Sequence, residues 1–170
     1  MIVLKNIKMT LDPASVARAI EAVKDFRNHL QAAMTHLIET LLERGVEIAR
    51  AELIFFWNPA YDTGALSQSL EAIMLNDKEG IITTGIMYAV FVEFGTGAVG
   101  SIQSHPLADE LGYKYDTEHH GLDGWVYYDS DGQFHWTAGM AARPFMYNTL
   151  RDLEEEAERI GGQVIAEYIP

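Results

Sequence analysis

The sequence predicts an α+β protein in which a long N-terminal helix and a C-terminal helix pack on a small antiparallel sheet of two hairpins, with a long loop. Apolar residues recur at helical spacing before residue 57 and again after Pro144. Between these regions, two pairs of strand-like runs are each joined by a short turn. The chain has 170 residues, of which 48% are hydrophobic and 22% charged, so we expect a single domain over residues 1–170.

The N-terminal helix has a clear start signal. Asp12 can cap a helix, and Pro13 suits its first turn. We expect a short helix that runs into a long one and ends near residues 53–57, because Asn58 and Pro59 break the pattern. The apolar positions on its face are Val16, Ile20, Val23, Leu30, Met34, Leu37, Leu41 and Ile48.

Two hairpins are expected after this helix. Residues 66–75 begin with a helical turn and become strand-like, residues 76–80 form a turn, and residues 81–87 form the partner strand. The second hairpin pairs residues 125–128 with residues 133–136 across an Asp-Ser-Asp-Gly turn.

The remaining chain divides into a long connection and a last helix. Residues 98–124 show no regular pattern and are too many for an ordinary connection, so we expect a long loop or arm inserted between the hairpins. Pro144 opens a helix that runs to about Ile160, where Gly161 and Gly162 should stop or bend it.

The charge of the chain excludes some partners. The formal net charge is −13, and the only basic residues between Arg50 and Arg143 are Lys78 and Lys114. This region cannot present the clustered cations that phosphate backbones require, so we expect no specific nucleic-acid binding. The acidity by itself indicates solubility. No apolar run is long enough for a bilayer, and the chain has no cysteine for a disulfide, a thiolate metal site or a nucleophile.

Three segments resemble ligand-binding motifs. Gly95, Gly97 and Gly100 form a GxGxxG pattern after a strand-like run, but a nucleotide site also needs a helix directly after the glycines inside a βαβ unit. We therefore expect a turn there. The segment from Asp129 to Gly132 resembles the start of a calcium loop, but its glycine comes too early, and we again expect a turn.

The third segment is a metal-like cluster around His119 and His120. Adjacent histidines do not share one face of a helix or strand, so a polar loop is the better interpretation. The nearby candidate ligands are His105, Asp116, Glu118 and Asp123. A ligand-binding domain or an enzyme built on Gly95–Gly100 or on His119–His120 is the alternative to the function given below.

Aromatic residues are crowded after the long loop, and Tyr and Trp are the residue types that dominate protein interfaces. They can equally fill the core of the second hairpin, and alternation along the strands allows both roles. The crowd comprises Tyr113, Tyr115, Trp125, Tyr127, Tyr128, Phe134, Trp136, Phe145 and Tyr147. The candidate interface residues are Tyr113, Tyr115, Trp125, Tyr127, Tyr128 and Trp136.

Three blocks occur in a fixed order along the chain. They are DTGALSQSL at Asp62–Leu70, YAVFVEFGTG at Tyr88–Gly97 and GMAARPFM at Gly139–Met146. Together they resemble the gene-ten-like family of tail-completion and head-to-tail joining proteins of long-tailed bacteriophages. The resemblance covers about residues 10–160.

The resemblance marks a set of structural residues. Asp62 and Thr63 can bond backbone amides of a turn while Gly64 takes a positive φ, and Gly95 and Gly97 let the chain leave a tight corner. Glu93 is expected to bond neighbouring backbone amides or to pair with Arg143. The full set is Asp62, Thr63, Gly64, Tyr88, Glu93, Gly95, Thr96, Gly97, Arg143, Pro144 and Phe145.

The resemblance also implies a function. A member of this family is a structural virion protein of a tailed phage or prophage, made in the bacterial cytoplasm and located at the neck or tail. It assembles with itself into a ring, such as a hexamer, and joins neighbouring neck or tail-tube proteins. Residues 98–124 would then be an arm that orders on docking. We expect no catalysis, no cofactor, no metal and no membrane.

Overall fold

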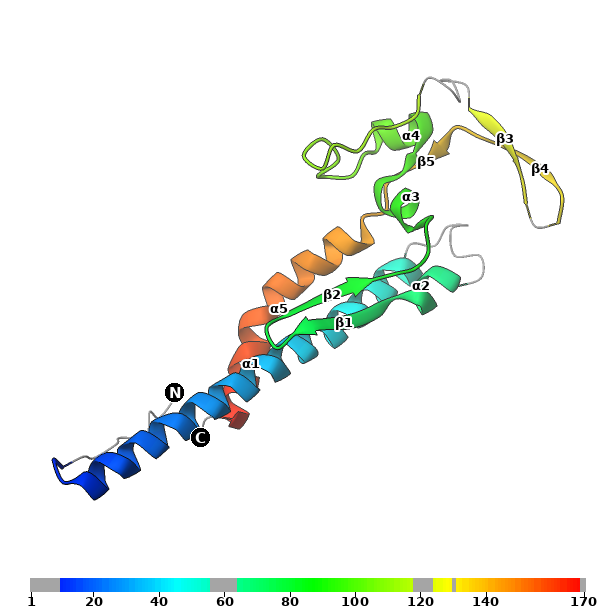
Figure 1. The fold of residues 1–170 in the computed structure, drawn as a ribbon. Coiled ribbons are helices and arrows are strands. Elements are labelled where there is room, and N and C mark those ends of the chain that lie inside the picture. The colour runs from blue at the N-terminus through cyan, green and yellow to red at the C-terminus, as the bar shows by residue number, and fades with distance from the viewer. Residues whose placement is uncertain (1–9, 56–63, 118–123, 130, 169–170) are drawn as a thin grey trace. The chain divides into compact units, whose positions relative to one another are not determined.

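The structure is a computed structural model and describes residues 10–55, 64–117, 124–129 and 131–168 (Figure 1). Its contacts group the chain into two compact units. The first unit combines Met1–Val46, Ala72–Thr83 and Asp152–Pro170, and the second combines Glu47–Glu71 and Thr84–Arg151.

The α+β prediction is confirmed, with a long N-terminal helix, a C-terminal helix and two antiparallel hairpins. The hairpins form two separate two-stranded sheets rather than one sheet. The elements are α1 (Pro13–Phe55), α2 (Ala65–Ser69), β1 (Glu71–Asn76), β2 (Glu79–Thr83), α3 (Ala89–Phe94), α4 (Gly97–Ile102), β3 (Trp125–Tyr128), β4 (Phe134–Thr137), β5 (Gly139–Met140) and α5 (Phe145–Tyr168).

Helix α1 begins at the predicted residue. The Ser15 amide donates to Asp12 Oδ1 at 2.9 Å, and the Thr10 amide donates to Ser15 Oγ at 2.9 Å. The first bond satisfies an amide that a helix start leaves free, and the second fixes the chain just before the helix. The expected division into a short and a long helix is wrong, since α1 is one helix of 43 residues.

The first unit is held together by α1 and α5. Ala33 of α1 and Ile160 and Val164 of α5 form a buried cluster, against which Leu37, Leu41 and Tyr168 pack. Helix α5 continues through Gly161 and Gly162 to Tyr168, so the predicted stop at these glycines is wrong. Burial of Val164 beyond them outweighs the helix propensity that two glycines lose.

The β1–β2 hairpin covers another part of α1 within the first unit. A Cβ added at Gly80 would meet Leu42 Cδ1 at 2.3 Å, and a Cβ added at Gly45 would meet Ile82 Cδ1 at the same distance. Gly80 and Ile82 thus face α1, and Ile81 between them faces away. Strand β2 ends at Thr83, earlier than the predicted end at residue 87.

The second unit contains the largest departure from the prediction. The run before the glycines is a helix, α3, and not a strand. Ala89, Val92 and Glu93 are its buried residues, and their spacing of three and four is helical. The segment after Gly97 begins with a helix, α4, whereas residues 103–117 contain turns but no further helix or strand.

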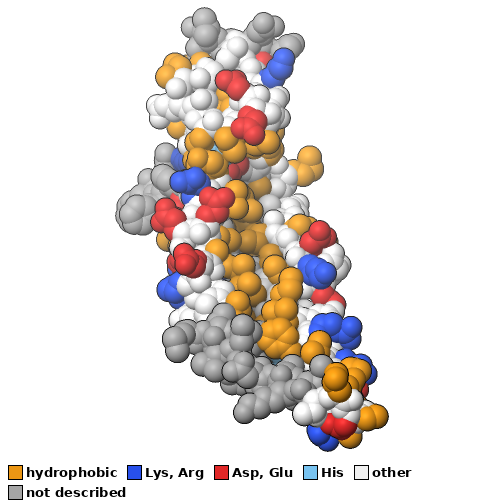
Figure 2. All heavy atoms as spheres, turned by 90° about the vertical axis from the view of Figure 1, so that its left-hand side faces the viewer, with side chains coloured by type: hydrophobic (Ala, Val, Ile, Leu, Met, Phe, Trp, Pro, Cys, Tyr) orange, Lys and Arg blue, Asp and Glu red, His pale blue; other side chains and the backbone are white. Residues whose placement is uncertain are grey.

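Hydrophobic side chains are not confined to the interior. In the space-filling view they gather in a band with acidic and basic side chains beside it (Figure 2). Exposed large hydrophobic side chains occur in both units, including Val23 and Leu75 in the first and Tyr128 and Trp136 in the second.

Substitution Gly162→Ala should raise the free energy of unfolding by about 0.5–1 kcal/mol, because alanine favours a helix and a Cβ there meets nothing within 4 Å. Gly95→Ala is the opposing control, because its φ is +81° and a Cβ would lie 2.6 Å from the Ala142 nitrogen. Urea unfolding measures both. A destabilised Gly162→Ala variant would contradict the continuous α5.

Acid should weaken the first unit through Glu156. Hydrogen bonds from Arg44, at 3.1 and 2.8 Å, hold the pKa of Glu156 below its ordinary value of 4.5. A lowered folded-state pKa means that this contribution is complete well above pH 4.5 and is lost as pH falls through the folded-state value. Glu156→Gln should therefore make stability less dependent on pH below 5, measured by thermal melts from about pH 3 to 7. Glu158→Gln should keep the wild-type acid dependence.

Candidate functional site

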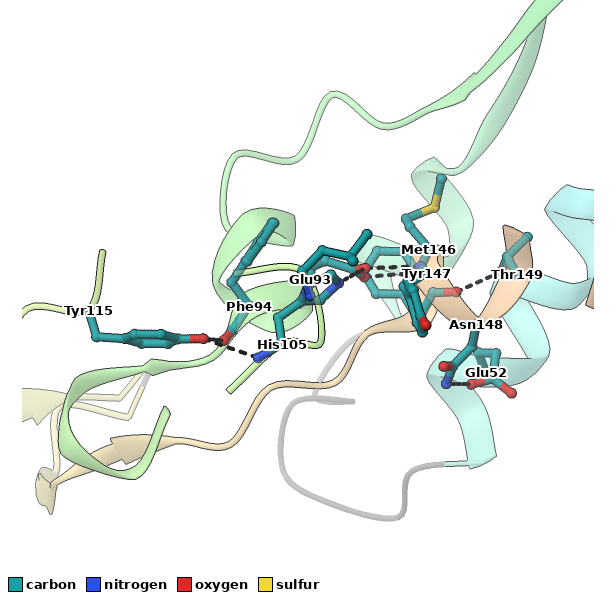
Figure 3. Close-up of polar contacts among 11 residues, drawn as sticks. Glu52, Glu93, Phe94, His105, Tyr115, Met146, Tyr147, Asn148 and Thr149 are labelled. Carbon is teal, nitrogen blue, oxygen red and sulfur yellow. Dashed lines mark hydrogen bonds and ion pairs between the residues drawn. The ribbon is translucent and has the colours of Figure 1, made fainter. Parts of the chain in front are cut away.

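The centre of the second unit is the carboxylate of Glu93. Its Oε2 accepts the amide proton of Met146 at 2.9 Å, and its Oε1 accepts that of Tyr147 at 3.0 Å (Figure 3). Both amides belong to the first turn of α5, where Pro144 has no side-chain oxygen to cap the helix. Glu93 is only 8% exposed, and it supplies the cap and a negative charge at the positive end of α5.

His105 completes the bonding of Glu93. Its Nδ1 accepts the amide proton of Leu107 at 3.0 Å, so Nε2 carries the ring proton and donates it to Glu93 Oε1 at 3.1 Å. His105 is 4% exposed, and its ring lies against those of Phe94 and Tyr147. This histidine has a structural partner and is not aimed at solvent.

Two tyrosines fold the segment after α4 back onto α3. The Tyr113 ring stacks on Phe94 with centroids 4.5 Å apart, and its hydroxyl donates to the Gly95 carbonyl. The Tyr115 hydroxyl donates to the Phe94 carbonyl at 2.9 Å and accepts the His105 amide proton. Burial raises the pKa of Tyr113. Residues 105–115 are thus bonded to the corner.

The corner after α3 requires its glycines. Gly95 has φ 81° and Gly97 has φ 60°, as the sequence predicts. Thr96 and Gly97 form bridges to Met140 and Gly139 of β5, and Thr96 Oγ1 accepts the Met140 amide proton. A Cβ at either glycine would meet backbone atoms at 2.6 to 2.7 Å, so a side chain would separate the two segments.

Glu93 bonds backbone amides, as one of the two alternatives predicts, and its side-chain partner among the described residues is His105 rather than Arg143. Arg143 contributes its backbone instead, and its amide donates to the Val92 carbonyl at 2.9 Å. Burial lowers the pKa of its guanidinium. Phe145, 1% exposed, anchors the start of α5. Tyr88 precedes α3 and is 43% exposed.

The first motif block is only partly described. Asp62 and Thr63 lie outside the described residues, whereas Gly64 precedes α2 with φ 70°, as predicted. Arg50 of α1 donates to the carbonyls of Ser67 and Leu70 at 3.0 and 2.9 Å. This arginine satisfies the free carbonyls at the end of α2.

The β3–β4 hairpin exposes an apolar face. Val126 pairs with Trp136, and Tyr128 pairs with Phe134, so all four side chains lie on one face. Their exposed fractions are 56%, 65%, 61% and 67%. We call this set the hairpin face. Sheets normally bury such a face, and a two-stranded hairpin is marginally stable in water.

The turn of this hairpin has its own bonds. Asp129 Oδ1 accepts the amide protons of Asp131 and Gln133, and Oδ2 lies 2.7 Å from His135 Nε2. The hydrogen bond from the Gln133 amide is the main cause of a lowered pKa at Asp129, and the hydrogen bond with His135 lowers the pKa further. The carboxylate that resembles a calcium ligand is thus engaged in the turn, as expected.

The six candidate interface residues fall into two groups. Tyr113 and Tyr115 pack within the unit, and Trp125 lies against Gly97. Tyr127, Tyr128 and Trp136 are 47%, 61% and 65% exposed. Val126 and Phe134 were missing from the set, although strict alternation along the two strands would have found both.

The alternative ligand sites find little support in the described residues. The Gly95–Gly100 segment follows one helix, α3, and begins another, α4, that has only six residues. A dinucleotide site needs a strand, a turn and a helix in that order. His119 and His120 lie outside the described residues. Within the described ranges, no three His, Asp or Glu side chains are placed to hold a metal. Nor does any helix there have the length and apolarity to cross a membrane.

No family model, curated protein or solved structure matches the chain.

Glu93→Gln should lower the free energy of unfolding by about 2–3 kcal/mol, because the amide group would face donors that the carboxylate now satisfies. Glu110→Gln, at an exposed position, is the matched control and should change little. Urea unfolding followed by circular dichroism measures both. Equal stability of the two variants would contradict the capping role of Glu93.

Proposed function

We propose that this protein is a structural virion component of a tailed phage or prophage that completes the tail and joins it to the head. The observation that carries the proposal is the hairpin face of Val126, Tyr128, Phe134 and Trp136. A contiguous apolar face that is more than half exposed favours a protein that works by docking.

The bonding of Glu93 supports the resemblance to the tail-completion family. Glu93 lies in the second block, and it caps the helix that the third block opens. Val92 and Arg143 join the same two blocks through their backbones. The residues that carry the resemblance thus have a physical reason to occur together, which a chance match would lack.

The site offers no constellation for catalysis. Glu93 and His105 are buried and bonded to each other and to backbone amides, so neither is poised to take a proton from a substrate. We propose that the chain has no enzymatic role and that it acts as a ring. The net charge of −13 would keep DNA from adsorbing as it passes through that ring.

Deleting the gene from the parent phage should give filled heads and separate tails, seen by electron microscopy, and wild-type protein from a plasmid should restore virions. A plasmid with Phe134→Ser and Trp136→Ser should not restore them, because the docking face is lost while the fold stays intact.

Ile102→Ser is the matched control, since Ile102 is 81% exposed but lies in α4, and it should restore virions. Normal virions from the deletion strain would refute the proposed function. Full rescue by the doubly substituted protein would show that the hairpin face is not needed for virion assembly.

A further inference from the structure

Part of α1 has no cover among the described residues. Every residue from Ile20 to Ala32 is exposed. Within the first unit, the ring of Tyr168, the last described residue of α5, lies against that of His36 with centroids 5.6 Å apart, and the Thr35 hydroxyl donates to the Asp77 carbonyl in the β1–β2 turn. The earlier turns of α1 continue beyond both elements (Figure 1). We call residues 13–32 the helical arm.

The arm carries the same apolar stripe that α5 covers further along α1. Apolar residues recur at spacings of three and four from Val16 to Leu41. In the covered half, Leu37 and Leu41 pack on the buried cluster. In the arm and the turn that follows, the exposed fractions of Ile20, Val23, Phe26, Leu30 and Met34 are 50%, 56%, 42%, 38% and 43%.

A helix with such a stripe needs a partner. Most helix stability in proteins comes from packing of the apolar face rather than from intrinsic propensity. The continuity of the stripe with the part that α5 covers indicates an apolar partner surface.

Charge distinguishes between partners. The helical arm contains three basic side chains, Arg18, Lys24 and Arg27, and two acidic ones, Glu21 and Asp25. The whole chain has 12 basic and 25 acidic residues, so the arm is a slightly basic part of a strongly acidic protein. It can approach the body of a second copy with attraction, whereas two arms would repel each other weakly.

The first unit also offers a surface that matches the arm. Ile73 and Leu75 alternate along β1 and are 38% and 57% exposed, and Ile81, which faces away from α1, is 42% exposed. Asp77 and Glu79 in and after the turn are exposed acids, and one exposed base, Lys78, lies between them. We call Ile73, Leu75 and Ile81 the outer face of β1–β2.

We propose that the helical arm of one copy docks on the outer face of β1–β2 of the next copy. The arm and the outer face are different surfaces, so the contact is heterologous and repeats from copy to copy until the ring closes. The inference deepens the proposed function and depends on it for the ring, although the contact itself can be measured on the purified protein.

Single-cysteine variants test the contact, because the natural chain has no cysteine. Val23→Cys and Leu75→Cys proteins, distinguished by a tag, are mixed and mildly oxidised, and the disulfide-linked pairs are separated by non-reducing electrophoresis. We expect at least tenfold more mixed dimer than either like dimer. Ser104→Cys mixed with Leu75→Cys is the matched control and should give no such excess. Adding Ile20→Asp to the Val23→Cys protein should abolish the mixed dimer.

Three results would overturn the proposal. A predominance of Val23→Cys like dimers would mean that arms pair with each other. An intrachain disulfide in a Val3→Cys, Val23→Cys double variant would mean that the first residues of the same chain occupy the stripe. A mixed dimer no more abundant than in the control would mean that the outer face is not the receptor.

The cross-linking experiment tests the contact between copies, and the virion phenotype tests the proposed function, so either hypothesis can be refuted without the other. Mixed dimers together with normal virions in the deletion strain would preserve the contact and refute the proposed function. Separate heads and tails together with no mixed dimer would preserve the function and refute the contact.

Discussion

The second unit depends on one buried interaction, the bonding of the Glu93 carboxylate to the start of α5. Pro144 leaves α5 without a local cap, and Glu93 reaches it from α3, more than fifty positions earlier in the sequence. His105 then fixes the orientation of the carboxylate, and its ring brings the segment after α4 onto Phe94. A single charged group thus connects three segments that are distant in sequence.

This arrangement explains why the aromatic residues divide into buried and exposed sets. Tyr113 and Tyr115 are engaged by the carbonyls of the corner that Glu93 stabilises. The hairpin face has no such partner among the described residues and stays exposed. Rigid corners and uncovered apolar faces in the same chain are consistent with a protein that is ordered before it docks. The high negative charge opposes non-specific association, so contact is favoured where apolar and basic groups coincide.

Local signals in the sequence were sufficient for much of the fold. The cap at Asp12 and the turn at Asp129 each follow from chemistry within a few residues, and both are present. The failures involve tertiary contacts. Ala89–Phe94 resembles a strand because its β-branched and aromatic residues obscure a helical spacing, and α5 passes Gly161 and Gly162 because Val164 is buried.

The candidate site divides in the same way. Positive φ at Gly95 and Gly97 was predictable, because closely spaced glycines after an apolar run indicate a tight turn without any knowledge of distant contacts. The pairing of Glu93 with His105 was not, because no periodicity links residues on α3 and in the loop after α4. The apolar stripe along α1 was visible in the sequence. Only the structure, in which α5 ends beside His36, shows that α5 leaves the first half of this stripe uncovered.

Amide hydrogen exchange, measured by mass spectrometry on the isolated protein and on purified virions, tests the claim that the chain has two docking surfaces, the hairpin face and the helical arm, and a Glu93 cap that is formed before docking. Exchange at residues 20–32 and in β3 and β4 should slow in virions, while exchange at Met146 and Tyr147 should already be slow in the isolated protein and stay unchanged. Unchanged exchange in the arm and the hairpin, or protection at Met146 and Tyr147 that arises only in virions, would contradict the account.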